Sequence, residues 1–156
     1  MKNYIRTIQL SIPGDLKNVS LVGAAVNKFC KLYPFPESEA FRIELCLSEA
    51  INNVIKHSYD CDVEKVVVLD VSMTNEEMEF RVRDRGKAND NFKIPDFDFD
   101  PTDIPNLPES GMGLFIINEV MDQVSYEVGS PENVLTMVKR FPVPMTTEAR
   151  LRPFPA

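Results

Sequence analysis

The 156-residue chain has no tryptophan, a single histidine and only three cysteines. The cysteines, Cys30, Cys46 and Cys61, are odd in number and lack metal-ligand spacing. We interpret them as reduced thiols that pack as small hydrophobic groups. With one histidine, His57, the chain also lacks the ligand set of the usual Cys/His zinc site. The scarcity of these residue types argues against a zinc site of the usual Cys/His type.

Long apolar runs are missing as well. No stretch of about 18 apolar residues occurs, so we expect no membrane-spanning helix. The first six residues, Met1 to Arg6, lack the apolar stretch and the small-residue cleavage site of a secretory signal. We therefore expect a cytoplasmic protein.

Positive charge is in deficit, because 17 basic residues stand against 24 acidic ones and give a formal net charge of −7. The basic residues are not concentrated in any segment, and an acidic surface is repelled by a phosphate backbone. We expect no direct DNA binding. A role in gene expression would then depend on protein partners.

Hydrophobic periodicity predicts an ordered series of elements. A strand at residues 4–12 precedes two helices, the first capped by Asp15 and the second running from Ser38 to about His57. Hairpins follow at 63–83 and 123–140, and a short helix at 113–121 lies between them. The apolar faces of the two long helices are predicted at Leu16, Val19, Gly23, Val26 and Cys30, and at Phe41, Leu45, Ile51 and Val54.

Hairpins favour a mixed, mostly antiparallel sheet, and helices bunched between them favour one helical layer. We therefore predict a two-layer α/β (α+β) sandwich as a single domain at residues 1–141, with a proline-rich tail at 142–156 that is frayed or loosely docked. Residues 86–108 show no consistent period, which is typical of a functional lid or a disordered loop.

The second predicted helix carries a row of polar residues. Glu49, Asn53 and His57 are spaced four apart and lie on one helix face, with Lys56 beside them. An ordinary solvated face is one explanation. A carboxylate, an amide, an ammonium and an imidazole on one face would instead suit a charged ligand.

Two further motifs follow in the chain. Asp84-Arg85-Gly86 ends a strand, where the aspartate could accept a hydrogen bond from an exocyclic amine and the glycine would let a flat ring approach the backbone. Taken alone, this motif is also a common turn.

The last motif is a glycine-rich segment that leads straight into a helix. Ser110, Gly111, Met112 and Gly113 would present backbone N–H groups to an anion at the helix N-terminus. A flexible hinge capped by Ser110 is the alternative for this segment alone.

The three motifs in this order resemble the N, G1 and G2 boxes of the GHKL ATPases, which share the Bergerat ATP-binding fold. The matching segments are Ser48-Glu49-Ala50-Ile51-Asn52-Asn53-Val54-Ile55-Lys56-His57, Asp84-Arg85-Gly86 and Glu109-Ser110-Gly111-Met112-Gly113-Leu114. The short length and the Ser-Gly-Met-Gly-Leu phrase are most similar to the anti-sigma-factor serine/threonine kinases.

The resemblance implies a role for each matched residue. Glu49 is the implied general base, and Asn53 the implied Mg²⁺ ligand. Lys56 and His57 correspond to positions near the phosphates of ATP. Asp84 corresponds to the aspartate that reads adenine, and Gly86 to the residue beneath the ring. The phosphate cradle corresponds to Ser110, Gly111, Met112 and Gly113.

The chain departs from the family pattern at two places. Ala88 stands where the family has a second glycine, and Glu132-Asn133 stands where the family often has Gly-Thr. The added methyl of Ala88 could tighten or shift the purine pocket. We assign Thr136 in the last strand to the pocket, and the 89–107 segment corresponds to the ATP lid.

The resemblance implies a homodimeric kinase that uses ATP and Mg²⁺. Its substrate would be a serine of an anti-sigma-factor antagonist, a small STAS-type protein, and it would also sequester a sigma factor. A nucleotide-gated binding module with little kinase activity is the alternative from another class. A pocket that has lost nucleotide binding is a third reading, against which the retained motif residues argue.

Overall fold

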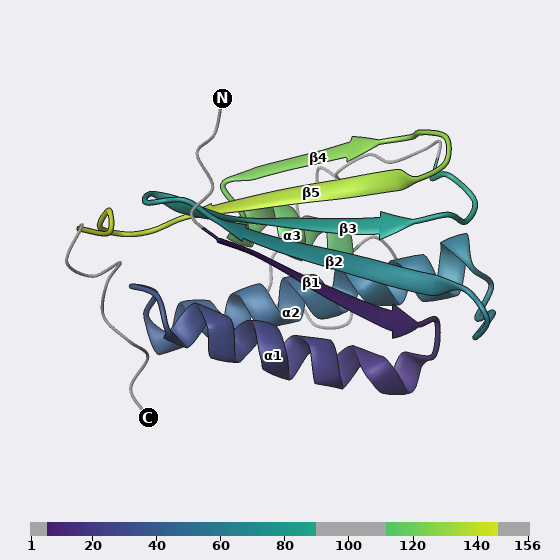
Figure 1. Ribbon diagram of the computed structural model, residues 1–156, viewed down its shortest axis with the longest axis horizontal. Coiled ribbons are helices and arrows are strands. Elements are labelled where there is room, and N and C mark those ends of the chain that lie inside the picture. The colour runs from purple at the N-terminus through teal and green to yellow at the C-terminus, as the bar shows by residue number, and fades with distance from the viewer. Residues whose placement is uncertain (1–5, 90–111, 147–156) are drawn as a thin grey trace, which may run out of the picture.

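The computed structural model describes residues 6–89 and 112–146 (Figure 1). The elements are β1 (Arg6–Pro13), the 3-10 turn η1 (Leu16–Asn18), α1 (Val19–Lys31), α2 (Glu37–Asn53), the π-helical turn η2 (Val54–Ser58), β2 (Val66–Met73), β3 (Glu77–Asp84), α3 (Met112–Val120), β4 (Gln123–Glu127) and β5 (Asn133–Arg140). Among the described residues, no helix is both long and apolar enough to cross a membrane.

The five strands form one sheet in the order β1-β2-β3-β5-β4, and every neighbouring pair is antiparallel. The three helices gather on one side of this sheet (Figure 1). The predicted two-layer α+β sandwich is confirmed. The sheet is antiparallel throughout, without the mixed directions that we allowed for.

The core lies between the sheet and the helices. Strand residues that alternate toward the helices are buried, and the central ones are Val67, Leu69, Val71, Met73, Met78, Phe80, Val82, Leu135 and Met137. The predicted inward positions of β3, at Met78, Phe80 and Val82, are confirmed. One face of each strand is apolar because only that face meets the helical layer.

The apolar faces predicted for the helices are corrected in part. Leu16, Phe41 and Leu45 are 42%, 56% and 46% exposed. Leu16 lies in η1, outside the helical phase of α1. In α2 the buried positions are Ala40, Ile43, Cys46, Leu47, Ala50 and Ile51, so the buried stripe includes small residues, and the larger Phe41 and Leu45 lie outside it.

The start of α2 also differs from the prediction, because the N-cap residue is Pro36 and not Ser38. Ser38 lies inside the first turn, next to Glu37 and Glu39, whose charges complement the helix dipole. Asp15 does act as a cap: its carboxylate accepts the Lys17 N–H at 3.0 Å. That cap begins η1, however, and α1 starts only at Val19.

The segment that follows β5 is docked on the domain, and it includes Phe141, the last residue of the predicted domain, and the first residues of the predicted tail. Phe141 is buried against the rings of Tyr33 and Phe35, with centroids 5.7 and 5.0 Å away. The Phe141 N–H donates to Glu76 O at 2.7 Å, and the Met145 N–H donates to Asn75 O at 2.8 Å. The chain up to residue 146 is therefore tied to the β2–β3 turn, and residues 147–156 lie outside the described part.

Candidate functional site

A cavity of about 240 Å³ lies between the end of α2, the inner face of the sheet and the first turn of α3. Its walls are formed by Ala50, Asn53, Val54, His57, Ser58, Asp84, Asn89, Gly113, Leu114, Tyr126 and Leu135. Four residues that the motifs predict, Asn53, His57, Asp84 and Gly113, therefore meet at one cavity although they are far apart in the sequence.

Helix α2 does not continue regularly to His57. After Asn53 the backbone forms a π-helical turn, in which the Tyr59 N–H donates to Val54 O at 2.9 Å. Such turns widen the helix locally and are frequent at functional sites. Asn53 and His57 still line the cavity, whereas Lys56 is exposed and is not among the residues of its wall.

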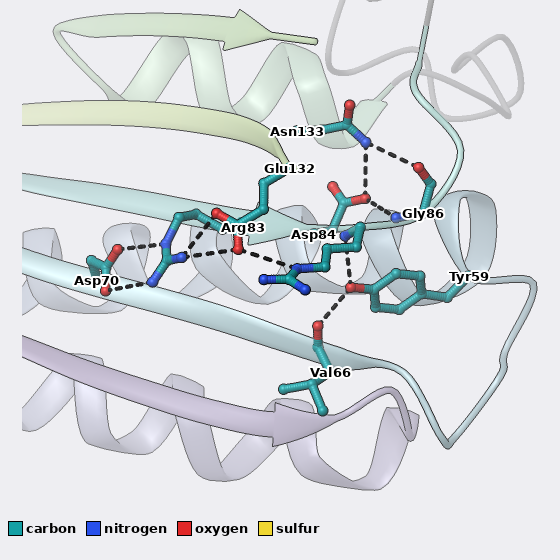
Figure 2. Close-up of polar contacts among 9 residues, drawn as sticks. Tyr59, Val66, Asp70, Arg83, Asp84, Gly86, Glu132 and Asn133 are labelled. Carbon is teal, nitrogen blue, oxygen red and sulfur yellow. Dashed lines mark hydrogen bonds and ion pairs between the residues drawn. The ribbon is translucent and has the colours of Figure 1, made fainter. Parts of the chain in front are cut away.

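Asp84 is the last residue of β3 and is only 3% exposed. Its Oδ1 accepts two hydrogen bonds, from the Gly86 N–H at 2.9 Å and from Asn133 Nδ2 at 3.2 Å (Figure 2). Asn133 Nδ2 also donates to Gly86 O at 3.2 Å. Within the described part of the chain, no protein donor reaches the second oxygen, Oδ2. Asp84 can therefore offer that oxygen to a donor on a ligand in the cavity.

The electrostatics of Asp84 are set by its surroundings. Burial raises the pKa of this carboxyl group above its ordinary value, and the hydrogen bonds from Gly86 and Asn133 offset only part of that effect. A donor from a ligand would satisfy the charged form further. The site is thus suited to an amine or amide N–H.

Gly86 fits tightly against the end of η2. A Cβ atom at this position would stand 2.2 Å from the backbone oxygen of Ser58, so a side chain is excluded. The Lys87 N–H donates to the same oxygen at 3.0 Å. Tyr59 connects this turn to β2, because its hydroxyl donates to Val66 O at 2.6 Å and accepts the Arg85 N–H at 3.0 Å (Figure 2).

Glu49 lies one turn of α2 before Asn53 and is not itself among the residues of the cavity wall, but it contacts Gly113, which is. A Cβ atom on Gly113 would stand 2.6 Å from Glu49 Oε2. The carboxylate is therefore held against the first turn of α3, where Met112 is the first helical residue. Backbone N–H groups at this end of a helix favour negative charge, on a side chain or on a bound anion.

The remaining predicted residues either lie away from the cavity wall or lie outside the described residues. Thr136 is paired with Arg81 and Ser125, on the outer face of the sheet, while its neighbour Leu135 lines the cavity. Our assignment of Thr136 to the pocket is corrected, because successive strand residues point to opposite faces. Ser110, Gly111 and most of the proposed lid lie at 90–111, outside the described residues.

Sequence reasoning missed three polar residues of the site, and one of them is Ser58 on the cavity wall. Asn133 holds Asp84, and the only signal for it was its place in the Glu132-Asn133 departure from the family pattern. Tyr126 lines the cavity from β4, and its hydroxyl accepts the Asn89 N–H at 3.0 Å. The alternation of β4 predicts that Tyr126 points inward, but no local pattern marks it as a site residue.

Known proteins are similar to this chain in sequence and in fold. The anti-sigma F factor of Clostridium perfringens is 36% identical over 134 residues, which cover 84% of this chain and 91% of that protein. The serine-protein kinase RsbW of Bacillus cereus is 24% identical over 128 residues, which cover 80% of this chain and 79% of the relative.

Among solved structures, the RsbU and RsbW domains of a Mycobacterium tuberculosis protein align with a TM-score of 0.63 at 16% identity. The alignment covers 91% of this chain and 35% of that one, and it supports the fold alone. The profile of the histidine kinase-like ATPase domain matches residues 12–139. Since that match spans most of the chain, the protein belongs to the histidine kinase-like ATPase domain family.

Proposed function

We propose that this protein is an ATP-dependent serine protein kinase of the anti-sigma-factor type. The observation that carries the proposal is that Asn53, Asp84 and Gly113 line one cavity while the Glu49 carboxylate lies against Gly113. Family membership and the names of the relatives, a serine-protein kinase and an anti-sigma F factor, support the same class.

Adenine would be read by Asp84. Its open Oδ2 can accept a hydrogen bond from the 6-amino group, whereas guanine presents a carbonyl oxygen at that position, which an ionised carboxylate repels. The apolar side chains of Ala50, Val54 and Leu135 on the cavity wall would contact the base. The glycine at position 86, which is not itself among the residues of the cavity wall, lets the backbone that follows Asp84 lie close to η2.

Magnesium would be held largely by the phosphates of the nucleotide, with Asn53 as the contributing side chain. An amide oxygen is the kind of hard ligand that Mg²⁺ takes beside phosphate oxygens and waters, and Asn53 lies on the cavity wall. The donor type at this position therefore fits the ion. When bound, the ion would neutralise charge on the transferred phosphoryl group.

Glu49 would act as the general base. In the proposed reaction, its carboxylate takes the proton from a serine hydroxyl of the partner as the oxygen attacks the γ-phosphorus and ADP leaves. The N–H groups in the first turn of α3 would meanwhile face the phosphates. Such a base contributes roughly 10²–10⁴-fold to a rate.

The substrate would be a serine of an anti-sigma-factor antagonist, and the protein would also sequester a sigma factor, acting as a homodimer. The name of one relative, an anti-sigma F factor, supports a sigma factor as a partner. The antagonist and the homodimer follow from the resemblance to the anti-sigma-factor kinases.

The test is phosphate transfer from radiolabelled ATP to a small anti-sigma-factor antagonist from the same genome. Glu49→Gln keeps the shape of the side chain but removes the base and one negative charge. We expect ATP affinity to be retained or improved and transfer to fall at least about 10²-fold. Glu44→Gln, also on α2, serves as the control for the charge change.

The outcome also separates the kinase from a nucleotide-gated binding module. A wild-type protein that binds ATP and the antagonist but transfers no phosphate would contradict the kinase proposal and favour the binding module. Absence of ATP binding altogether would contradict both.

A further inference from the structure

The hydrogen bond from Asn133 to Asp84 lies on the inner face of the sheet, and an ion-pair network lies next to it on the outer face. Asp84 and Asn133 are paired directly in the β3–β5 register. Arg83 precedes Asp84 and Glu132 precedes Asn133, so both point to the outer face. There Arg83 Nη1 lies 2.9 Å from Glu132 Oε2 and 3.2 Å from Oε1 (Figure 2).

This network crosses most of the sheet. Arg83 Nε donates to Asp70 Oδ2 at 2.7 Å, and Gln9 Nε2 donates to Asp70 Oδ1 at 2.8 Å, which links β3 to β2 and β1. Arg85 Nε lies 3.5 Å from Glu132 Oε1. The side chains of Arg83, Asp70 and Glu132 are only 22%, 15% and 23% exposed. Charge pairs with a fork of donors in this partly desolvated setting are stronger than exposed ones.

Glu132 stands at the point where the β4–β5 hairpin enters β5. Residues 127–131 are all exposed, so the tip of this hairpin gains little from apolar packing. The next residue, Asn133, is 3% exposed and spans Asp84 and Gly86 with its amide. The ion pair with Arg83 thus anchors the hairpin one residue before the amide that orients Asp84.

We propose that Glu132 is a positioning residue for purine recognition. Its ion pair with Arg83 holds Asn133 in place, and Asn133 fixes the Asp84 carboxylate with Oδ2 open toward the 6-amino group of adenine. The inference rests on the proposed function, and it makes the preference for ATP over GTP depend on charges outside the cavity.

The expected loss of ATP affinity follows from the free energy of one oriented hydrogen bond. If Glu132 no longer holds the hairpin, Asn133 can turn and Asp84 can rotate, so the carboxylate loses its fixed direction. A net hydrogen bond of about 0.5–1.5 kcal/mol corresponds to roughly a two- to tenfold loss of affinity. GTP, which does not use this bond, should lose much less.

The experiment measures the dissociation constants of MgATP and MgGTP by calorimetry for the full chain. Glu132→Gln should weaken ATP binding within that two- to tenfold range and reduce the ATP-to-GTP preference by a similar factor. Arg83→Lys keeps the positive charge but loses the guanidinium group that donates to both Asp70 and Glu132. It should also weaken ATP binding and reduce the ATP-to-GTP preference. Glu127→Gln is the matched control, because Glu127 is exposed on the outer face of β4 and should leave both constants unchanged.

A double-mutant cycle tests whether Glu132 acts through Asn133. Asn133→Ser should reduce the preference by itself, and adding Glu132→Gln should then have little further effect. Additive losses in the double variant would overturn the inference. It would also be overturned if Glu132→Gln and Arg83→Lys both kept the wild-type ATP-to-GTP preference. If Asn133→Ser does not fold, these two single variants on the outer face decide the question. A wild type that binds no ATP contradicts the proposed function instead.

Discussion

Gly113 and Glu49 share one small space, because a Cβ atom on Gly113 would stand 2.6 Å from Glu49 Oε2. The obstacle is the far end of a flexible side chain. Gly86 differs, since its Cβ would stand 2.2 Å from the backbone oxygen of Ser58. The two glycines are therefore required for different reasons, the first by the placement of a carboxylate and the second by the packing of the backbone.

Gly113→Ala should fold normally but transfer phosphate slowly. The Glu49 carboxylate can swing aside, and alanine is favoured over glycine in a helix by about 1 kcal/mol, so the free energy of unfolding should change by less than about 1 kcal/mol. A displacement of about 1 Å at a reacting group can cost about 10²-fold in rate. We expect transfer to fall at least about tenfold, measured beside Asn118→Ala on the exposed face of α3. Unchanged transfer would show that the position of Glu49 seen here does not matter for catalysis.

Gly86→Ala should instead destabilise the domain. Because the backbone of η2 must move, we expect the free energy of unfolding to fall by about 1–3 kcal/mol in denaturant titrations. Gly23→Ala is the control: its Cβ would meet only side-chain atoms, of Ser48 and Glu44, at 3.1 Å or more. A Gly86→Ala protein as stable as Gly23→Ala would contradict the packing described for the turn.

Asp84→Asn should stabilise the nucleotide-free protein at neutral pH. Burial raises the pKa of Asp84 in the folded state. The Asp84 carboxyl group therefore binds a proton more tightly in the folded protein than in the unfolded chain. This difference stabilises the fold at low pH, and the stabilisation is lost as the pH rises through the raised pKa. Asparagine removes the buried charge, and its amide oxygen can still accept from Gly86 and Asn133.

The measurement is the melting temperature of wild type and Asp84→Asn at several pH values, with and without nucleotide. The advantage of Asp84→Asn should be present at pH 7 and should shrink below about pH 4, where aspartate is protonated in both states. Stabilisation by ATP should weaken at the same time, because the 6-amino group loses its acceptor. A lower melting temperature of the apo variant at pH 7 would argue against the role of burial.

Lys139→Met should destabilise the fold without affecting ATP affinity. Lys139 Nζ lies 2.7 Å from Glu39 Oε1 and donates to Val120 O at 2.6 Å, at the end of β5 remote from Asn133. Both charged side chains are 16% exposed, so we expect a loss of about 2–3 kcal/mol, slightly below the range for fully buried pairs. Lys31→Met, which breaks an exposed pair with Glu37, should cost about 0–1 kcal/mol. A shift in the ATP dissociation constant of Lys139→Met would contradict the separation of this pair from the site.

Local pattern was sufficient for much of the fold. The alternation of Met78, Phe80 and Val82 predicts a strand with one buried face, and the structure confirms it. The same kind of reasoning failed for Phe41 and Leu45, because helical spacing defines an apolar stripe but not which of two stripes the sheet covers. In α2 the covered stripe includes the small Ala40 and Ala50, which are not conspicuous in a sequence.

The sequence by itself determined the order of the three motifs and the residue types that they carry, because each motif is a short stretch of chain with its own chemistry. Tertiary structure alone decided that Asn133 meets Asp84 across 49 residues and that Thr136 points away from the cavity. Both outcomes depend on the register between β3 and β5, where a shift of one residue exchanges the two faces of a strand. That register is set by the packing of the whole sheet on its helices, and no short segment encodes it.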